Sequence, residues 1–236
     1  MPNKAFVPYP LTHGLLVDLS LDDFPTQLYG FSRKVHILDL CANGTHFGYV
    51  HEGQVILHCA SGVFTLRAGM YFSLPGGGTL FGEGRGIAIA RLGYQGMFSI
   101  GGPIEPEGRL RYIDGCRDSL LIPPVMKGDP CLNALYFPPR IEQTQHFHPS
   151  MRIGIIVSGR GECITEDEVI PLVPGQVFVI PAGGLHSFRT EDSPMVVCAY
   201  HPDSDCGPTD ESHPMVNRTL VNGIPASLLE EIRTYA

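Results

Sequence analysis

The sequence lacks long apolar segments, an excess of positive charge and a sustained helical period, and each absence narrows the class of protein. No apolar run approaches the about 18 residues of a membrane helix, and no basic start precedes an apolar segment as in a signal peptide. The 16 lysines and arginines are outnumbered by 24 aspartates and glutamates, and the net charge of −8 argues against a nucleic-acid partner. We therefore expect a cytoplasmic protein that binds neither membranes nor nucleic acids.

The seven cysteines also lack a regular arrangement, since none of them forms a CxxC pair. An odd number of cysteines without an export signal predicts reduced thiols rather than a disulfide framework. A free cysteine packs as a small apolar side chain, so we expect most of the seven to lie in the core.

Turn-forming residues are abundant, with 28 glycines and 21 prolines in 236 residues. They separate short apolar runs, a pattern that is typical of an all-β sandwich or barrel. The expected strands span residues 35–41, 47–50, 54–59, 63–66, 71–74, 86–92, 119–122, 131–137, 153–157, 162–164, 168–172, 177–180 and 195–200.

The second half of the chain repeats the first at a spacing of 106 residues. This ungapped shift places Gly48 on Gly154 and Phe72 on Phe178, among other identities that fall mostly at turn residues. The simplest account is two copies of one barrel joined by a polar, turn-rich connector at 101–111.

The domains are expected at residues 1–105 for the first barrel, 106–205 for the second barrel and 206–236 for a tail. Residues 1–30 are broken by Pro8, Pro10 and Pro25, and we expect them to wrap the first barrel or a partner subunit. In the tail, Ser227 is followed three residues later by Glu230. This capping box predicts one short C-terminal helix.

Three histidines of the second copy form a candidate metal site. His146 and His148 stand two apart, which on an extended strand directs both imidazoles to one face. His186 follows a turn, and it would join them if the two segments are antiparallel neighbours in one barrel. Neutral imidazole is a common metal ligand, so we expect one divalent metal ion per chain at this place.

The first copy has none of these ligands. The shift of 106 residues places Leu40, Ala42 and Leu80 at the three histidine positions. None of these side chains can bind a metal ion. We therefore expect a structural first barrel without metal and a second barrel that holds one.

Residues 146–186 resemble the two-part signature of the cupin superfamily. The second part keeps every spacing of that signature, with Gly175, Pro181, Gly183 and His186. The first part supplies the paired histidines. The resemblance implies jelly-roll barrels of the double-stranded β-helix type, here in a tandem arrangement similar to that of the bicupins.

Arg152 departs from the signature, because the family usually has a glutamate ligand at this position. An arginine beside three neutral imidazoles would make the site strongly cationic and should weaken metal binding. A guanidinium can hold a carboxylate through two parallel hydrogen bonds, so we interpret Arg152 as the residue that binds a small anionic substrate. The alternative is an arginine turned to solvent at the barrel rim.

Two further positions are candidates for the same site. Tyr200, at the end of the last strand, could donate a hydrogen bond inside the barrel, although a core tyrosine fits the position as well. Glu142 would share the strand face of the histidines and could supply a distant carboxylate, with Gln143 pointing the other way.

A polar, proline-rich loop follows the last strand. His201, Asp203 and His213 could form a second metal cluster there, although such a loop is more often a lid or a subunit contact. Cupins commonly dimerise, and barrels with open ends leave sheet edges that need covering. We therefore expect a homodimer.

The family resemblance implies a range of activities rather than one. Members with three histidines and no glutamate include iron dioxygenases, so the first hypothesis is an Fe(II)-dependent dioxygenase that acts on a small anionic substrate. The second is a redox-neutral lyase, hydrolase or isomerase that uses zinc, nickel or manganese. The third is a non-catalytic cupin that binds a small ligand or has a regulatory role.

Overall fold

The computed structural model describes residues 4–32, 37–203, 220–222, 224–225 and 228–231 of the chain. Within these ranges the protein is almost entirely β-structure, with the 3₁₀ turn η1 (Ile113–Gly115) between strands. The all-β class that the sequence predicts is therefore confirmed. In the part of the chain that is described, no helix is long and apolar enough to cross a membrane.

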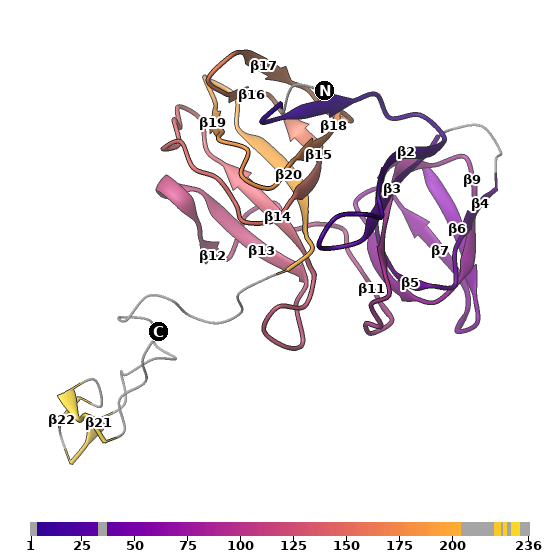
Figure 1. Cartoon of the computed structure of the whole chain (residues 1–236), viewed down its shortest axis with the longest axis horizontal. Helices are drawn as coiled ribbons and strands as arrows, with labels where there is room; N and C mark the ends of the chain where they lie inside the picture. Colours follow the sequence, from indigo (N-terminus) through magenta and orange to yellow (C-terminus); the bar gives the residue numbers. More distant parts are fainter. Residues whose placement is uncertain (1–3, 33–36, 204–219, 223, 226–227, 232–236) are drawn as a thin grey trace.

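The first half of the chain forms two sheets with a core between them (Figure 1). Six strands make one sheet in the order β11-β8-β5-β10-β3-β2, and four make the other in the order β4-β9-β6-β7. The strands are β2 (Gly14–Leu19), β3 (Thr26–Phe31), β4 (Leu38–Leu40), β5 (Gly44–Glu52), β6 (Gln54–Cys59), β7 (Gly62–Arg67), β8 (Tyr71–Pro75), β9 (Gly78–Gly82), β10 (Arg85–Leu92) and β11 (Ser99–Gly101). Apolar side chains from both sheets, such as Leu57 and Phe72, fill the space between them.

The second half repeats this arrangement with a sheet in the order β1-β18-β15-β20-β14-β13-β12 and a three-stranded sheet in the order β17-β16-β19. Its strands are β12 (Leu110–Arg111), β13 (Arg117–Ile122), β14 (Cys131–Phe137), β15 (Arg152–Gly159), β16 (Gly161–Ile164), β17 (Val169–Leu172), β18 (Val177–Ile180), β19 (Ser187–Arg189) and β20 (Met195–His201). Phe137, Phe178 and Phe188 lie in the core of this barrel.

The repeat has a direct counterpart in packing. Gly48 pairs with Phe72 across β5 and β8, and Gly154 pairs with Phe178 across β15 and β18. A Cβ atom on Gly48 would lie 2.0 Å from the Phe72 ring, and one on Gly154 would lie 2.3 Å from the Phe178 ring. Both glycines are therefore required because a phenylalanine ring covers the backbone at the equivalent place in each barrel.

The two barrels share a core between their larger sheets. The Phe47 ring of the first barrel and the Tyr200 ring of the second have centroids 5.3 Å apart. Because side chains alternate along a strand, β20 directs Val197 and Ala199 into its own barrel and Cys198 and Tyr200 into the shared core. One strand therefore forms both the interior of the second barrel and the contact with the first.

The start of the chain differs from expectation. Strand β1 (Val7–Tyr9) pairs with β18 of the second barrel rather than wrapping the first, and Phe6 stacks on Phe178 with ring centroids 4.9 Å apart. The first barrel takes only the later part of the expected segment, as β2 and β3. Burial of an aromatic residue at position 6 explains the placement, since the second barrel offers the apolar site.

The tail is described in part. Residues 220–222 and 224–225 contain the short strands β21 (Leu220–Val221) and β22 (Ile224–Pro225), which pair with each other. The expected C-terminal helix begins at Ser227, which lies outside the described residues. The stretch 228–231, which is described, contains no α-helix.

Candidate metal centre

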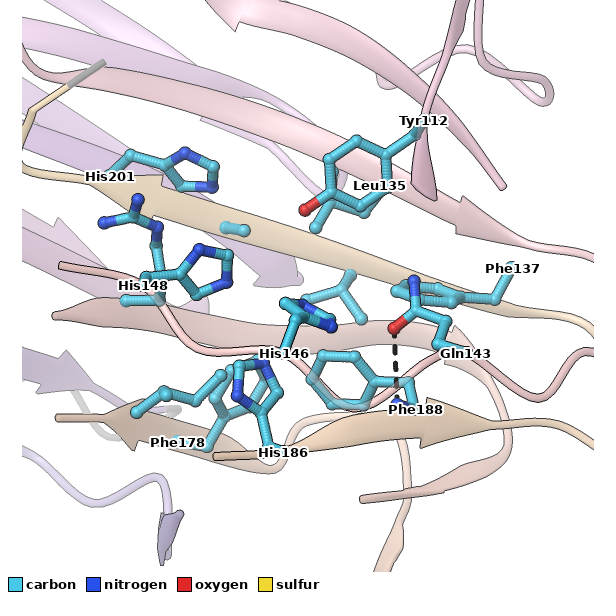
Figure 2. A pocket seen from close by; sticks show the side chains of 14 residues that line it. Tyr112, Leu135, Phe137, Gln143, His146, His148, Phe178, His186, Phe188 and His201 are labelled. Carbon is cyan, nitrogen blue, oxygen red and sulfur yellow. Dashed lines mark hydrogen bonds between the residues drawn. The ribbon is translucent and has the colours of Figure 1, made fainter. Parts of the chain in front are cut away.

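The three predicted histidines converge inside the second barrel. One ligand nitrogen from each of His146, His148 and His186 lies within 4.8 Å of the other two. Ring centroids are 4.6 Å apart for His146 and His186, and 5.1 Å apart for His146 and His148. Figure 2 shows the three rings grouped at one end of the pocket.

The backbone that carries the histidines is less regular than the expected strand. His146 and His186 form an isolated antiparallel bridge, in which the amide of each donates to the carbonyl of the other at 2.9 and 3.0 Å. The Gly183 amide donates to the carbonyl of His148 at 2.8 Å. These bonds tie the two segments together, so the turn before His186 fixes its distance from the other two rings.

Two of the three imidazoles have a tautomer fixed by the backbone. Nδ1 of His146 lies 2.9 Å from the carbonyl oxygen of Thr144, and Nδ1 of His186 lies 2.9 Å from that of Gly184. A carbonyl oxygen only accepts, so each Nδ1 carries the hydrogen and donates it. Nε2 therefore keeps its lone pair and can bind a metal ion. Histidines that bind a metal through one ring nitrogen commonly donate the other N–H to an acceptor such as a backbone carbonyl, which orients the ring.

Burial keeps two of the three imidazoles neutral. Burial and, to a smaller extent, the charge of Arg152 lower the pKa of His148 to about 3. Burial also lowers the pKa of His186 to about 4. Both rings are therefore neutral at pH 7, which is the form that binds a metal ion, and the donor set fits a divalent metal.

A cavity lies beside the triad. Most of its wall is apolar, with side chains from both sheets of the second barrel. These residues include Leu135, Phe137, Phe178, Ile180, Phe188 and Val197. This lining suits a small molecule with an apolar body and few polar groups.

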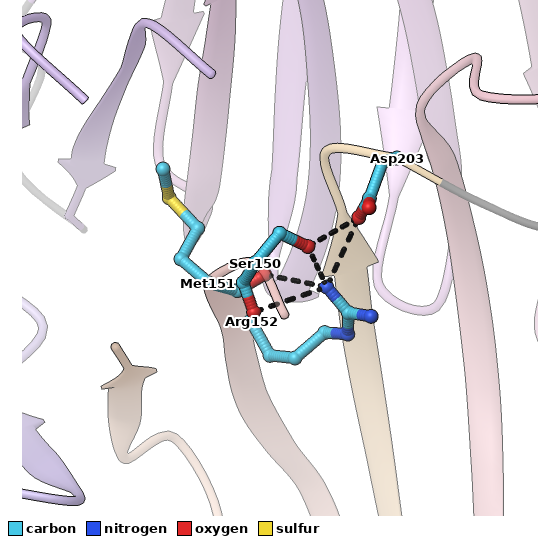
Figure 3. Close-up of polar contacts among 4 residues, drawn as sticks. All are labelled: Ser150, Met151, Arg152 and Asp203. Atoms are coloured by element: carbon cyan, nitrogen blue, oxygen red, sulfur yellow. Dashed lines mark hydrogen bonds and ion pairs between the residues drawn. The ribbon is translucent and has the colours of Figure 1, made fainter. Parts of the chain in front are cut away.

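Arg152 lines the cavity and is largely buried, with 12% of its side chain exposed. Figure 3 shows its Nη1 directed at Ser150, Met151 and Asp203. Nη1 donates to the Met151 carbonyl at 2.8 Å and to Asp203 Oδ1 at 3.3 Å, and Ser150 Oγ donates to the same carboxylate oxygen. Asp203 thus offsets the charge of Arg152, so the site is less cationic than the sequence predicts.

The other edge of the guanidinium has no partner among the described residues. Nε of Arg152 is buried without a hydrogen bond, and every hydrogen bond of the guanidinium starts at Nη1. A buried donor without a partner is costly, about 1–3 kcal/mol. The Nε–Nη2 edge is therefore the part of Arg152 that a ligand carboxylate would complete.

Tyr200 does not belong to the site. Its side chain is fully buried in the core shared with the first barrel, and it does not line the cavity. The expectation of a hydrogen bond inside the barrel is therefore wrong, and the alternative of a core tyrosine is confirmed. The reason is strand alternation, since the neighbouring His201 faces the cavity and Tyr200 must face away.

Glu142 and Gln143 exchange the places expected for them. Glu142 is exposed, and its backbone forms an isolated β-bridge with Arg189. Gln143 is buried and lines the cavity. The amide of Phe188 donates to Gln143 Oε1 at 3.3 Å (Figure 2). The expectation assumed a continuous strand, but this segment makes only isolated bridges, so a period of two does not hold.

Two cavity residues were not predicted for this site. His201 lies at the end of β20, and Tyr112 follows β12 in the connector region. No second group of potential metal ligands occurs among the described residues, and His213 of the expected cluster lies outside them. Alternation along β20 could have indicated His201, but nothing in the local sequence marks Tyr112.

The register of the strands refines the comparison between barrels. In the first barrel Leu40 pairs with Gly78, whereas in the second His146 pairs with His186. The structural counterpart of His186 is therefore Gly78 and not Leu80. The segment that joins the paired positions is two residues longer in the second barrel, which accounts for the difference. Neither Leu40 nor Gly78 of the first barrel can bind a metal ion.

The comparisons with known proteins agree with this geometry. The family model of the cupin domain matches residues 135–200, which run from β14 to the end of β20. No match was found among curated proteins.

Several solved structures share the fold. A cupin 2 conserved barrel domain protein from Leptotrichia buccalis is 14% identical, with a TM-score of 0.60, over 86% of this chain and 92% of that chain. Salicylate 1,2-dioxygenase from Pseudaminobacter salicylatoxidans is 10% identical, with a TM-score of 0.59, over 80% of this chain and 76% of that chain. A variant of the dioxygenase in complex with gentisate is 11% identical, with a TM-score of 0.57, over 75% of this chain and 68% of that chain. At these identities the likeness concerns the fold. The family match and the two-part motif identify residues 135–200 as a cupin domain, and the solved structures share the barrel fold.

Proposed function

We propose that the protein is an Fe(II)-dependent dioxygenase that acts on a small anionic substrate. His146, His148 and His186 would hold the metal, and Arg152 would hold the substrate. The observation that carries the proposal is that Arg152 lines the same cavity as the three histidines, while its buried Nε has no hydrogen-bond partner among the described residues.

The metal ligands support iron through number and type. Three neutral nitrogen ligands leave several coordination positions open, and imidazole suits iron as well as zinc, nickel and copper. When bound, the iron would supply the open positions and the redox chemistry that oxygen activation requires. The tautomers of His146 and His186, held by the Thr144 and Gly184 carbonyls, leave the Nε2 lone pair of each ring available to a metal ion.

The substrate is inferred from the rest of the cavity. The Nε–Nη2 edge of Arg152 is a two-pronged donor that matches a carboxylate, and the apolar wall suits a compact, apolar or aromatic body. Asp203 holds the opposite side of the guanidinium, so the open edge stays in one orientation. The resemblance in fold to a dioxygenase of an aromatic acid supports this substrate class.

Exclusion of water is a further contribution of the chain. Phe178 and Phe188 pack beside the triad, with the Phe188 ring centroid 5.5 Å from that of His186. A dry site strengthens the ion pair between substrate and arginine and limits side reactions.

Two measurements test the proposal. Metal analysis of protein purified without added metal should find about one iron per chain, and oxygen consumption should appear with salicylate, gentisate or related acids. Bound zinc with hydrolysis, lyase or isomerase activity would favour the redox-neutral alternative. An absence of turnover with any acid, in protein that holds iron, would favour a ligand-binding cupin.

A further inference from the structure

Tyr112 reaches the cavity from outside the expected strands. It lies between β12 and η1, where its amide donates to the Cys116 carbonyl at 3.0 Å and closes a tight turn. The ring lines the cavity together with Arg152 and the histidines. In Figure 2 its hydroxyl points inward, away from the backbone that carries it.

The hydroxyl has no hydrogen-bond partner among the described residues. The ring packs against the apolar cluster that fills the second barrel. Burial and, to a smaller extent, the nearby carboxyl of Asp118 raise the pKa of Tyr112 to about 12. The phenol therefore keeps its proton at neutral pH and is available as a donor.

The charge balance of the cavity leaves room for such a donor. Asp203 partly offsets the positive charge of Arg152, so a bound anion would meet only part of that charge. A neutral hydrogen-bond donor adds to anion binding without adding charge next to the metal ligands. Tyr112 and Arg152 line the same cavity, so one small ligand could contact both.

We propose that Tyr112 is a specificity-determining residue, whose hydroxyl donates a hydrogen bond to the same anionic group that the open edge of Arg152 holds. This inference rests on the anionic substrate of the proposed function, and it does not depend on the metal or on oxygen chemistry. The ligand class is a small carboxylic acid with an apolar body, selected against its neutral amide.

A matched tyrosine provides the control. Tyr136 lies on β14 in the same barrel, but its hydroxyl donates to the Glu105 carbonyl at 2.8 Å and it does not line the cavity. Removing one oxygen from either tyrosine changes packing very little. Only the change at Tyr112 should alter ligand binding.

The test is calorimetric binding of benzoate, salicylate and neutral benzamide to the full-length, metal-free chain. Wild type should prefer benzoate to benzamide, and Tyr112→Phe should weaken benzoate binding about tenfold or more while leaving benzamide binding unchanged. Tyr136→Phe should bind all three as wild type does. Combining Tyr112→Phe with Arg152→Ala should cost less than the sum of the single changes, because both residues contact one group.

The outcomes separate this inference from the proposed function. If wild type prefers benzoate but Tyr112→Phe binds it equally well, the role of Tyr112 is overturned and acid recognition stands. If wild type does not prefer either acid to benzamide, acid recognition itself fails and both proposals fall. Thermal unfolding of Tyr112→Phe should match wild type, which excludes a general loss of structure.

Discussion

Arg152 and Asp203 form an ion pair at the edge of the histidine cavity, with Nη1 of the arginine 3.3 Å from a carboxylate oxygen. The pair occupies one side of the guanidinium and leaves Nε buried without a partner on the other. Where a cupin usually has a metal ligand, this chain has a cation that is already half neutralised. The position is therefore suited to hold an anion without repelling a metal ion strongly.

Arg152→Ala should weaken the binding of small acids and leave metal content unchanged. Loss of a hydrogen bond to a charged group corresponds to about 1.5–3 kcal/mol, or roughly 10–100-fold in affinity. Arg152→Lys should restore little, because an ammonium cannot reproduce two parallel hydrogen bonds. Calorimetry with salicylate and metal analysis measure the two effects. If the alanine variant binds acids as tightly as wild type does, Arg152 is a residue of the barrel rim and does not bind the substrate.

His148→Ala should abolish metal binding, since two remaining imidazoles do not make a site for a divalent ion. His58→Ala is the matched control, because His58 is exposed in the first barrel. His201→Ala is a second control, since this ring lines the cavity but lies outside the ligand group. Metal content per chain is the measurement. Metal retained in His148→Ala, or two metals in wild type, would contradict the assignment.

Gly154→Ala and Gly48→Ala should destabilise the two barrels in the same way. An added Cβ would overlap the ring of Phe178 or Phe72, and overpacking of this kind typically costs about 1–3 kcal/mol. Chemical denaturation measures the loss. Phe178→Leu should recover part of it in the Gly154→Ala background, because the smaller side chain leaves space. Wild-type stability in either alanine variant would show that the ring can move aside.

Asp118 should make stability depend on pH. It is buried, Asn133 Nδ2 donates to its Oδ2 at 3.2 Å, and burial raises its pKa from 3.8 to about 7. The folded state therefore binds the proton more tightly than the unfolded state between these values. The free energy of unfolding should fall as pH rises through this window, by up to a few kcal/mol, and level off above about 7.

Asp118→Asn should remove this dependence while keeping an oxygen that can accept from Asn133. Urea denaturation of both proteins at several pH values between about 4 and 8 is the measurement. The variant should gain stability relative to wild type as pH rises. Parallel curves would show that the carboxyl is hydrated or ionised in the folded protein.

Much of the site could be predicted from sequence because its histidines lie in short segments that are close together in the chain. The spacing of His146 and His148, and the turn before His186, follow from local geometry. The repeat also located the glycines on which Phe72 and Phe178 pack. These features depend on residues within one or two strands.

The remaining parts depend on contacts between distant segments. Tyr112 enters the cavity from a turn, and Asp203 reaches Arg152 from beyond the last strand, so neither has a local signal. Tyr200 was placed wrongly because the barrel has a second buried face against the first barrel, where a strand residue is equally hidden. Gln143 was placed wrongly because its segment is not a regular strand.

The pairing of β1 with β18 sets an order of events during synthesis. Val7 pairs with Val179, so β1 cannot pair until β18 has been synthesised. The first barrel, whose strands lie between them in sequence, can be completed while β1 is still unpaired. The barrel that carries the histidines therefore closes only after the first barrel has been made, and a metal ion can enter a finished site only at that stage.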